Sequence, residues 1–220
     1  MRTDGPATLA ADTDAAAERV LIDLYRKMTP AQKLHAIFEL QRTADAIAVP
    51  YAVGGSVASG LHGEPRMTQD VDILVDLPPR RVEPFVTALQ PEFYVDLEAA
   101  RSAVRSESFF NAIHLSFHHK VDLFVASDDL LDREQLARRI PVTLSADESR
   151  PIFVTAAENI FLRKLDWFRK GNEISDVQWR DILGLLKIGR GVLDLDYARR
   201  IADTAGLADL LDRALAQANY

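Results

Sequence analysis

Asp70 and Asp72 have the residue type and the spacing that could do metal chemistry. They lie two residues apart in the segment DVDILV, so a strand would project both carboxylates from one face. Two like charges on one face repel each other, and a hard divalent cation bound between them removes that repulsion. The alternative is that both carboxylates lie on a solvated face of the strand.

Asp122 is a third carboxylate, and it interrupts the apolar run from Val121 to Val125. A charge there is costly without a partner. If its strand lies beside the strand of Asp70 and Asp72, the three carboxylates converge, as in sites that hold two metal ions on a triphosphate. The chain has no cysteine, so oxygen ligands for Mg²⁺ or Mn²⁺ are expected. The alternative is a residue at a strand end that reaches solvent.

Gly54, Gly55 and Ser56 form a candidate phosphate-binding loop. In the segment YAVGGSVASGLHG a short apolar run precedes paired glycines and a serine that opens a helical stretch. Glycines let the backbone approach a ligand closely, and a helix N-terminus offers unpaired amides to phosphate. The same pattern also occurs where the glycines only form a turn.

Lys164 and Asp181 each lie on an apolar helix face, where a charge needs a partner or a polar cleft. Contacts to a bound nucleotide would satisfy both residues, and so would a salt bridge between them. Asp166 is predicted to face away into solvent. The cations that could line a local basic cleft are Arg163, Lys164, Arg169, Lys170 and Arg180.

The loop and the carboxylates together resemble the nucleotidyltransferase fold of the DNA polymerase beta superfamily, over about 51–126. The quoted pattern is Gly55-Ser56, then Asp70-x-Asp72, then Asp122. The preceding Arg66-x-Thr68 is similar to a variant in small bacterial members, and by that likeness Arg66 contacts phosphate. The resemblance implies a Mg²⁺- or Mn²⁺-dependent transfer of a nucleoside monophosphate group from a nucleoside triphosphate to an acceptor hydroxyl.

A second segment, from Phe161 to Leu186, resembles the later motifs of AbiEii-type toxin-like nucleotidyltransferases. Members of that group place a lysine and a later aspartate near the nucleotide, and the matching positions here are Lys164 and Asp181. This likeness implies a toxin-like role and an antitoxin partner.

The expected fold class is α+β, with a small mixed sheet flanked by helices. We expect an N-terminal tail and helices over 1–48, a nucleotidyltransferase core over 49–154 and a helical C-terminal part over 155–220. Capping-box spacing at Thr155 and Glu158 predicts the start of a helix. The pattern predicts helices at 14–28, from Thr29–Pro30 onward, around 82–89, and at 176–188, 196–205 and 207–218; strands are predicted at 70–75, 93–97, 112–117 and 121–126.

Composition narrows the function classes. A net charge of −7 disfavours broad attraction to nucleic acid, and no stretch is apolar enough to span a membrane. No export signal is evident, so a cytoplasmic protein is expected. The acceptor is open between a protein, a small molecule and transfer RNA. The alternative function is a catalytically silent nucleotide-binding or toxin–antitoxin partner protein of the same fold.

For several other residues the sequence favours a role in the fold or at the surface over a role in a functional site. The three histidines His114, His118 and His119 are predicted to be solvent-exposed, because no further ligand has suitable spacing for a metal site. Asp76 is interpreted as a strand-end cap before two prolines. Trp167, Phe168 and Trp179 are expected to pack between helices.

Overall fold

A mixed β-sheet forms the centre of the computed structural model, which describes residues 30–62, 71–117, 120–143 and 151–220. Within these residues the sheet has seven strands in the order β3-β4-β5-β2-β1-β7-β6. Strand β2 pairs in parallel with β5, and β1 pairs in parallel with β7, while the other pairs are antiparallel. The strands are β1 (Tyr51–Val53), β2 (Val71–Val75), β3 (Phe93–Val95), β4 (Phe109–His114), β5 (Lys120–Val125), β6 (Ile140–Val142) and β7 (Ile152–Val154).

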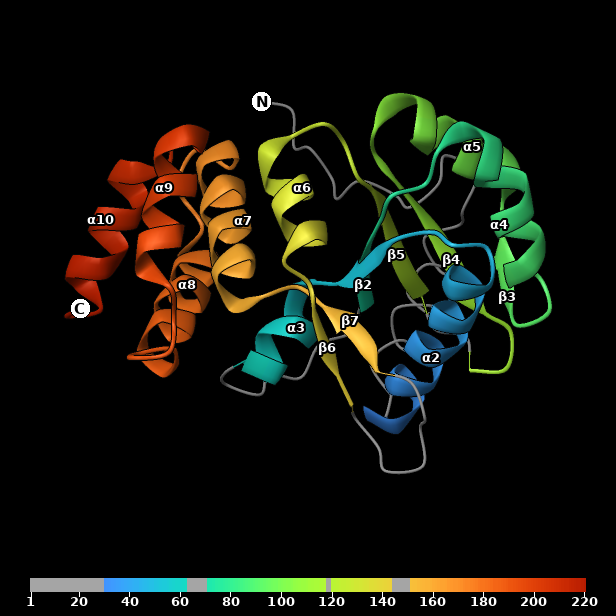
Figure 1. Cartoon of the computed structure of the whole chain (residues 1–220), viewed down its shortest axis with the longest axis horizontal. Coiled ribbons are helices and arrows are strands. Elements are labelled where there is room, and N and C mark those ends of the chain that lie inside the picture. The colour runs from blue at the N-terminus through green and yellow to red at the C-terminus, as the bar shows by residue number, and fades with distance from the viewer. Residues whose placement is uncertain (1–29, 63–70, 118–119, 144–150) are drawn as a thin grey trace, which may run out of the picture.

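Helices surround this sheet, and the predicted α+β class is confirmed. Figure 1 shows α7 to α10 gathered at one end of the molecule, with α4 and α5 at the other end. The helices are α2 (Pro30–Ala46), α3 (Gly55–His62), α4 (Val82–Leu89), α5 (Leu97–Ser106), α6 (Leu130–Ala137), α7 (Ala157–Lys170), α8 (Asp176–Ile188), α9 (Leu195–Ala205) and α10 (Ala208–Gln217), with a short 3₁₀ turn at Pro79–Arg81.

The central strands alternate in the way their sequence predicts. Val71, Ile73 and Val75 of β2 are fully buried, and so are Val121 and Leu123 of β5. Their apolar side chains share one face of the sheet, because successive residues of a strand point to opposite faces. Asp72 and Asp122 therefore project from the other face.

Helix α7 anchors the helical C-terminal part to the rest of the molecule. It contacts α3 and α6 as well as α8, α9 and α10. Its side chains Phe161, Leu162 and Leu165 are completely buried, and such burial supplies most of the stabilisation of a helix in a protein. Helices α8, α9 and α10 match the ranges predicted from sequence to within one residue at each end.

Several elements between Phe93 and Val154 were either not predicted from the sequence pattern or were predicted with different bounds. The strand predicted over 93–97 ends at Val95, because the Asp96 carboxylate accepts hydrogen bonds from the amides of Glu98 and Ala99 and caps α5. Helix α6 was also missed, and its N-cap is Asp129. Strands β6 and β7 span three residues each, too short for a periodic signal.

The predicted capping box at Thr155 and Glu158 is wrong. Helix α7 starts at Ala157 with Ala156 as an N-cap that has no side-chain hydrogen bond. The Thr155 amide donates to the carbonyl of Val53 and extends the pairing of β7 with β1. Glu158 Oε1 instead accepts a hydrogen bond from the amide of Asp194. Sheet pairing and a contact with the loop before α9 thus replace the local cap.

Some predictions fall on residues outside the described ranges. These are the helix over 14–28, the position of Asp70, and the turn that holds His118 and His119. Among the helices that the structure does describe, none combines the length and the apolar character needed to cross a membrane.

The packing of α7 yields a stability prediction. Leu165→Ala removes a fully buried side chain and should lower the free energy of unfolding by about 2–5 kcal/mol, through lost transfer energy and a residual cavity. Urea unfolding followed by circular dichroism measures this change. Asp203→Ala on the exposed side of α9 is the control and should stay within about 0.5 kcal/mol of the wild type. Equal stabilities of the two variants would contradict the packing.

Candidate active site

Two of the three predicted carboxylates are direct neighbours in the sheet. The parallel pairing of β2 with β5 puts Asp72 opposite Asp122 in register. Residues opposite each other on adjacent strands point to the same face, so both carboxylates share the face predicted for them. Asp70 lies outside the described residues, and within those residues no group of three potential metal-ligating side chains occurs.

Asp122 lies among polar side chains. It is only 8% exposed, and Lys120 Nζ lies 3.0 Å from its Oδ2 atom. On its other side, the antiparallel pairing of β4 with β5 puts Asn111 opposite Asp122. The Oδ1 atom of Asn111 is buried and makes no hydrogen bond within the described part of the chain. A row of oxygen atoms therefore crosses the sheet from Asn111 through Asp122 to Asp72.

The glycine loop directly follows β1 and lies beside Asp72 of the neighbouring strand β2. The Gly54 amide donates to the carbonyl of Asp72 at 2.8 Å, and the Gly54 carbonyl accepts the amide of Ala58 in the first turn of α3. Gly55 has a φ of +54°, and a Cβ added to it would lie 2.6 Å from Cγ of Asp72. Glycine is therefore required at position 55, both for its φ and for the close approach to the carboxylate. Ser56 follows it on α3.

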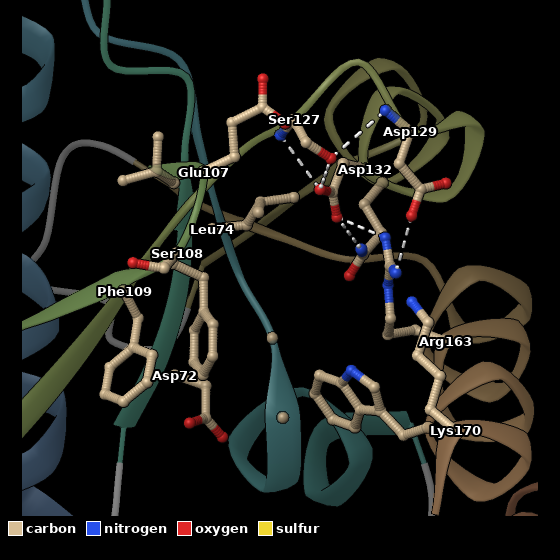
Figure 2. A pocket seen from close by; sticks show the side chains of 16 residues that line it. Asp72, Leu74, Glu107, Ser108, Phe109, Ser127, Asp129, Asp132, Arg163 and Lys170 are labelled. Carbon is tan, nitrogen blue, oxygen red and sulfur yellow. Dashed lines mark hydrogen bonds and ion pairs between the residues drawn. The ribbon is translucent and has the colours of Figure 1, made fainter. Parts of the chain in front are cut away.

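A pocket of about 240 Å³ opens beside Asp72. Its sheet side consists of Asp72 and the apolar residues of β2, β4 and β5, and its opposite side of residues from α6 and α7. Figure 2 shows Asp72 and Phe109 across the pocket from Arg163 and Lys170. The residues that line it are Gly54, Gly55, Asp72, Leu74, Glu107, Ser108, Phe109, Phe124, Val125, Ser127, Asp129, Asp132, Gln135, Arg163, Trp167 and Lys170.

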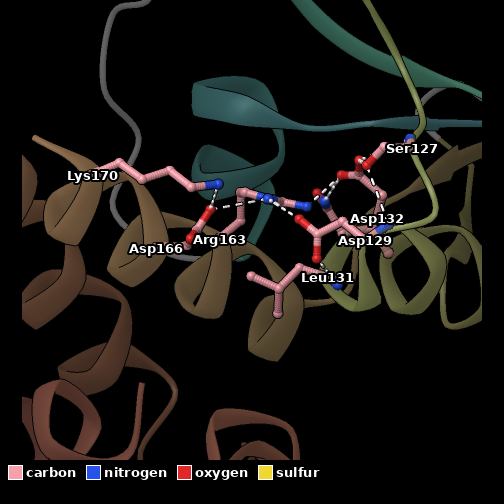
Figure 3. A network of polar contacts seen from close by, with 8 residues as sticks. Ser127, Asp129, Leu131, Asp132, Arg163, Asp166 and Lys170 are labelled. Carbon is pink, nitrogen blue, oxygen red and sulfur yellow. Dashed lines mark hydrogen bonds and ion pairs between the residues drawn. The ribbon is translucent and has the colours of Figure 1, made fainter. Parts of the chain in front are cut away.

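An arginine with three carboxylates forms the far wall of this pocket. Arg163 Nη1 donates to Asp129 Oδ2 and Asp166 Oδ2, each at 3.0 Å, and Nη2 donates to Asp132 Oδ1. Lys170 Nζ joins the group through Asp166 Oδ2 at 2.8 Å. Figure 3 shows this network bridging α7 to the N-terminal end of α6. Its density of charge-assisted bonds fixes the two helices to each other.

The polar contacts of α7 and α8 correct the prediction for Asp166 and show the partners of the predicted cleft cations. Asp166 does not face away into solvent, because it pairs with Arg163 and Lys170. The cations proposed for a basic cleft are also engaged: Arg163, Lys164, Arg169 and Lys170 all pair with carboxylates, and Arg180 donates to the carbonyl of Asp176. Lys170 and Arg180 find their partners one turn away on their own helices, whereas Lys164 and Arg169 pair with aspartates of other helices that only the tertiary fold brings near.

Asp129 has a perturbed acidity within this network. Burial, the largest single influence, favours a higher pKa. The amide of Leu131 and the charge and hydrogen bond of Arg163 together outweigh burial, so the pKa of Asp129 lies below its usual value. The carboxylate therefore stays ionised wherever the protein is folded near neutral pH.

Lys164 and Asp181 form an ion pair between α7 and α8, with 3.2 Å between Nζ and Oδ2. A salt bridge between Lys164 and Asp181 is one of the two alternatives predicted from the sequence, the other being contacts of both residues with a bound nucleotide. Neither residue lines the pocket beside Asp72. Their contact with a nucleotide stays a prediction, as does the phosphate contact of Arg66, which lies outside the described residues.

The predictions that His114 is exposed and that Trp167, Phe168 and Trp179 pack between helices are confirmed only in part. His114 is buried at 1% exposure, against prediction, and stacks near Phe93 and Phe117. Phe168 and Trp179 pack against each other at 5.0 Å between ring centroids, as expected. Trp167 instead lines the pocket and is 38% exposed.

Comparison with known proteins gives structural matches alone. No family model and no curated protein matches the sequence. The solution structure of the antibiotic-resistance factor ANT(2″)-Ia matches 84% of this chain and 97% of its own, with 15% identity and a TM-score of 0.50. The chain has the nucleotidyltransferase fold. Identity this low extends the likeness to the fold and no further.

Two further structural matches have TM-scores below 0.5. An antigenic nucleotidyltransferase-like protein from Paracoccidioides brasiliensis is 17% identical over 83% of this chain and 91% of its own, with a TM-score of 0.47. The lincosamide antibiotic adenylyltransferase LnuA, bound to lincomycin, is 16% identical over 73% of this chain and 98% of its own, with a TM-score of 0.42.

Gly55 provides a test of the loop geometry. Gly55→Ala should destabilise the protein by more than Gly191→Ala, although both residues have a positive φ. Both substitutions carry a conformational cost of about 1–2 kcal/mol, but only Gly55 approaches another residue, since nothing lies within 4 Å of a Cβ at Gly191. Urea unfolding of the two variants measures the difference. Equal losses would show that Gly55 does not abut Asp72.

The lowered pKa of Asp129 predicts a pH dependence of stability. A carboxylate whose pKa is lower in the folded state contributes stability above its unfolded pKa, and this contribution is lost as the pH falls through the folded pKa. Asp129→Asn should therefore flatten the acid side of the stability profile measured by urea unfolding between about pH 6 and pH 2. Asp203→Asn, an exposed control, should leave the profile unchanged. A parallel profile for Asp129→Asn would refute the assignment.

Proposed function

We propose that this protein is a metal-dependent nucleotidyltransferase that moves a nucleoside monophosphate group from a nucleoside triphosphate to an acceptor hydroxyl. The observation that carries the proposal is the register of Asp72 with Asp122 beside the glycine loop. Two carboxylates on adjacent strands repel each other. A structural role has no need of that repulsion, whereas a divalent cation on a triphosphate requires the charges.

The residues fit Mg²⁺ or Mn²⁺. Carboxylate and amide oxygens are hard donors, and Asp72, Asp122 and the buried Oδ1 of Asn111 lie in one row. The missing side chain of Gly55 leaves space at the Asp72 carboxylate. By the superfamily resemblance, Asp70 adds a further ligand. A bound cation would supply charge neutralisation at the reacting phosphate.

The remaining groups position the substrates. The amides at the start of α3 and the Ser56 hydroxyl hold the phosphates of the triphosphate, with Arg66 as a further contact; the start of α3 directly after the glycine pair supports this assignment. Asp122 accepts the proton of the acceptor hydroxyl. The acceptor oxygen then bonds to the α-phosphorus, the bond from that phosphorus to the bridging oxygen breaks, and pyrophosphate leaves.

Other parts of the proposal rest on the resemblance of Phe161–Leu186 to AbiEii-type proteins. Lys164 would leave Asp181 to neutralise charge on the triphosphate, and Asp181 would contact the nucleotide. The ion pair between Lys164 and Asp181 supports this joint role, because it shows that the two side chains face each other from α7 and α8. A toxin-like role with an antitoxin partner belongs to the same proposal.

Calorimetric titration with each nucleoside triphosphate, with and without Mg²⁺, tests the function. Asp72→Asn and Asp122→Asn should each weaken Mg²⁺-dependent binding at least about tenfold, or about 1.4 kcal/mol, while the folded state persists. Asp76→Asn is the matched control, since Asp76 follows β2 with the same parity but is exposed at its end. Triphosphate binding that ignores both Mg²⁺ and the two variants would overturn the proposal.

A further inference from the structure

Lys120 places a positive charge beside the row of oxygen atoms that crosses the sheet. It lies on β5 two residues before Asp122, so both side chains project from the same face of the sheet. Its Nζ atom lies 3.0 Å from Asp122 Oδ2, and the two side chains are only 16% and 11% exposed. The ammonium and the carboxylate therefore meet largely shielded from water.

This ion pair differs from those of the helical part in what it connects. Arg163 and Lys164 pair with carboxylates of α6 and α8 and so join helices to each other. The pair of Lys120 with Asp122 lies within one strand and does not connect two elements. Its main effect is therefore on the charge of Asp122.

The pair offsets the repulsion between Asp122 and Asp72. These two aspartates lie opposite each other in the register of β2 with β5, and like charges in that position destabilise a sheet. An ammonium at one of them lowers the summed negative charge of the metal-free protein. Loss of one partner from a mostly buried pair leaves an uncompensated charge, which is strongly destabilising. Lys120 thus helps the strands keep their register before a metal ion binds.

The same ammonium opposes a divalent cation at Asp122. Coordination of Mg²⁺ or Mn²⁺ uses the lone pairs of carboxylate oxygens, and the Lys120 ammonium lies against one of these oxygens. Two cations at one carboxylate repel each other, and the repulsion is strong where water screens it little. A metal ion must therefore bind against this charge or displace the ammonium. Lysine suits displacement, because its charge is carried on a flexible four-carbon stem.

A nucleoside triphosphate changes this balance. Mg²⁺ in proteins is commonly held by one or two carboxylates together with phosphate oxygens of the substrate. The phosphates add ligands and negative charge, and both offset the repulsion that Lys120 exerts on the metal ion. We therefore expect weak binding of the metal ion alone and tight binding of the metal ion together with the triphosphate.

We propose that Lys120 regulates the loading of the metal ion: its ammonium competes with the divalent cation for Asp122, so that the cation binds tightly only together with the triphosphate. The proposal rests on the nucleotidyltransferase function and adds an order of binding to it. By thermodynamic linkage, the metal ion strengthens triphosphate binding by the same factor as the triphosphate strengthens metal binding. Lys120 acts through Asp122 and is not a catalytic residue.

Titration with Mn²⁺ tests this role without turnover, with the free ion measured by electron paramagnetic resonance. In the absence of nucleotide, Lys120→Met should bind Mn²⁺ at least about tenfold more tightly than the wild type, or by about 1.4 kcal/mol. Lys120→Arg keeps the charge and should bind as weakly as the wild type. Lys187→Met, an exposed control on α8, should also leave the affinity unchanged. A non-hydrolysable triphosphate should raise the Mn²⁺ affinity of the wild type more than that of Lys120→Met.

The direction of the change separates charge competition from a structural role. Replacement of a residue that only holds the site in shape would weaken Mn²⁺ binding, whereas removal of a competing charge strengthens it. The gain should disappear when Lys120→Met is combined with Asp122→Asn, because the lysine acts through that carboxylate. Lys120→Met should also unfold at a lower temperature than the wild type without Mn²⁺ and recover most of this loss in excess Mn²⁺.

The outcomes distinguish the regulatory role from the function on which it rests. If the wild type binds Mn²⁺ together with the triphosphate, three results would overturn the role of Lys120 alone: unchanged or weaker Mn²⁺ binding by Lys120→Met, an equal gain in Lys120→Arg, or a Lys120→Met protein that stays unfolded in excess Mn²⁺. If neither the wild type nor any variant binds Mn²⁺ with the triphosphate, the nucleotidyltransferase function is overturned as well.

Discussion

The parallel pairing of β2 with β5 is the constraint on which the candidate site depends. It holds Asp72 opposite Asp122, and a shift of one residue would turn one of the carboxylates to the apolar face. The fully buried side chains of Val71, Ile73, Val121 and Leu123 fix that register, since each would be exposed to the polar face after a shift. The hydrophobic core thereby specifies the position of the charges.

The helical C-terminal part closes the other side of this site. Helix α7 is held to the core by Phe161 and Leu165 and to α6 by the Arg163 network. An arginine surrounded by carboxylates costs desolvation and is weak evidence for stability in general. Its geometry here has a clear consequence, because the ion pairs of Arg163 join α6 to α7 along one wall of the pocket.

Sequence reasoning located the chemistry of the sheet better than the chemistry of the helices. The period-two pattern around Asp72 and Asp122 and the glycine pair need only local information, and the structure brings these residues together as predicted. Two of the three carboxylate partners of Arg163, Asp129 and Asp132, lie at the start of a helix that the pattern did not predict. Glu107 and Gln135 carried no signal, since an exposed helix-end glutamate and a mid-helix glutamine are ordinary until the fold makes them face one pocket.

A crystal of the protein with Mn²⁺ and a non-hydrolysable nucleoside triphosphate tests the central claim most directly, through the anomalous scattering of the metal. The account predicts Mn²⁺ between Asp72 and Asp122, at about 2.0–2.2 Å from their oxygens, as expected for a small hard cation, with the triphosphate against the loop from Gly54 to Ser56. A triphosphate bound elsewhere, or Mn²⁺ that contacts neither aspartate, would contradict it.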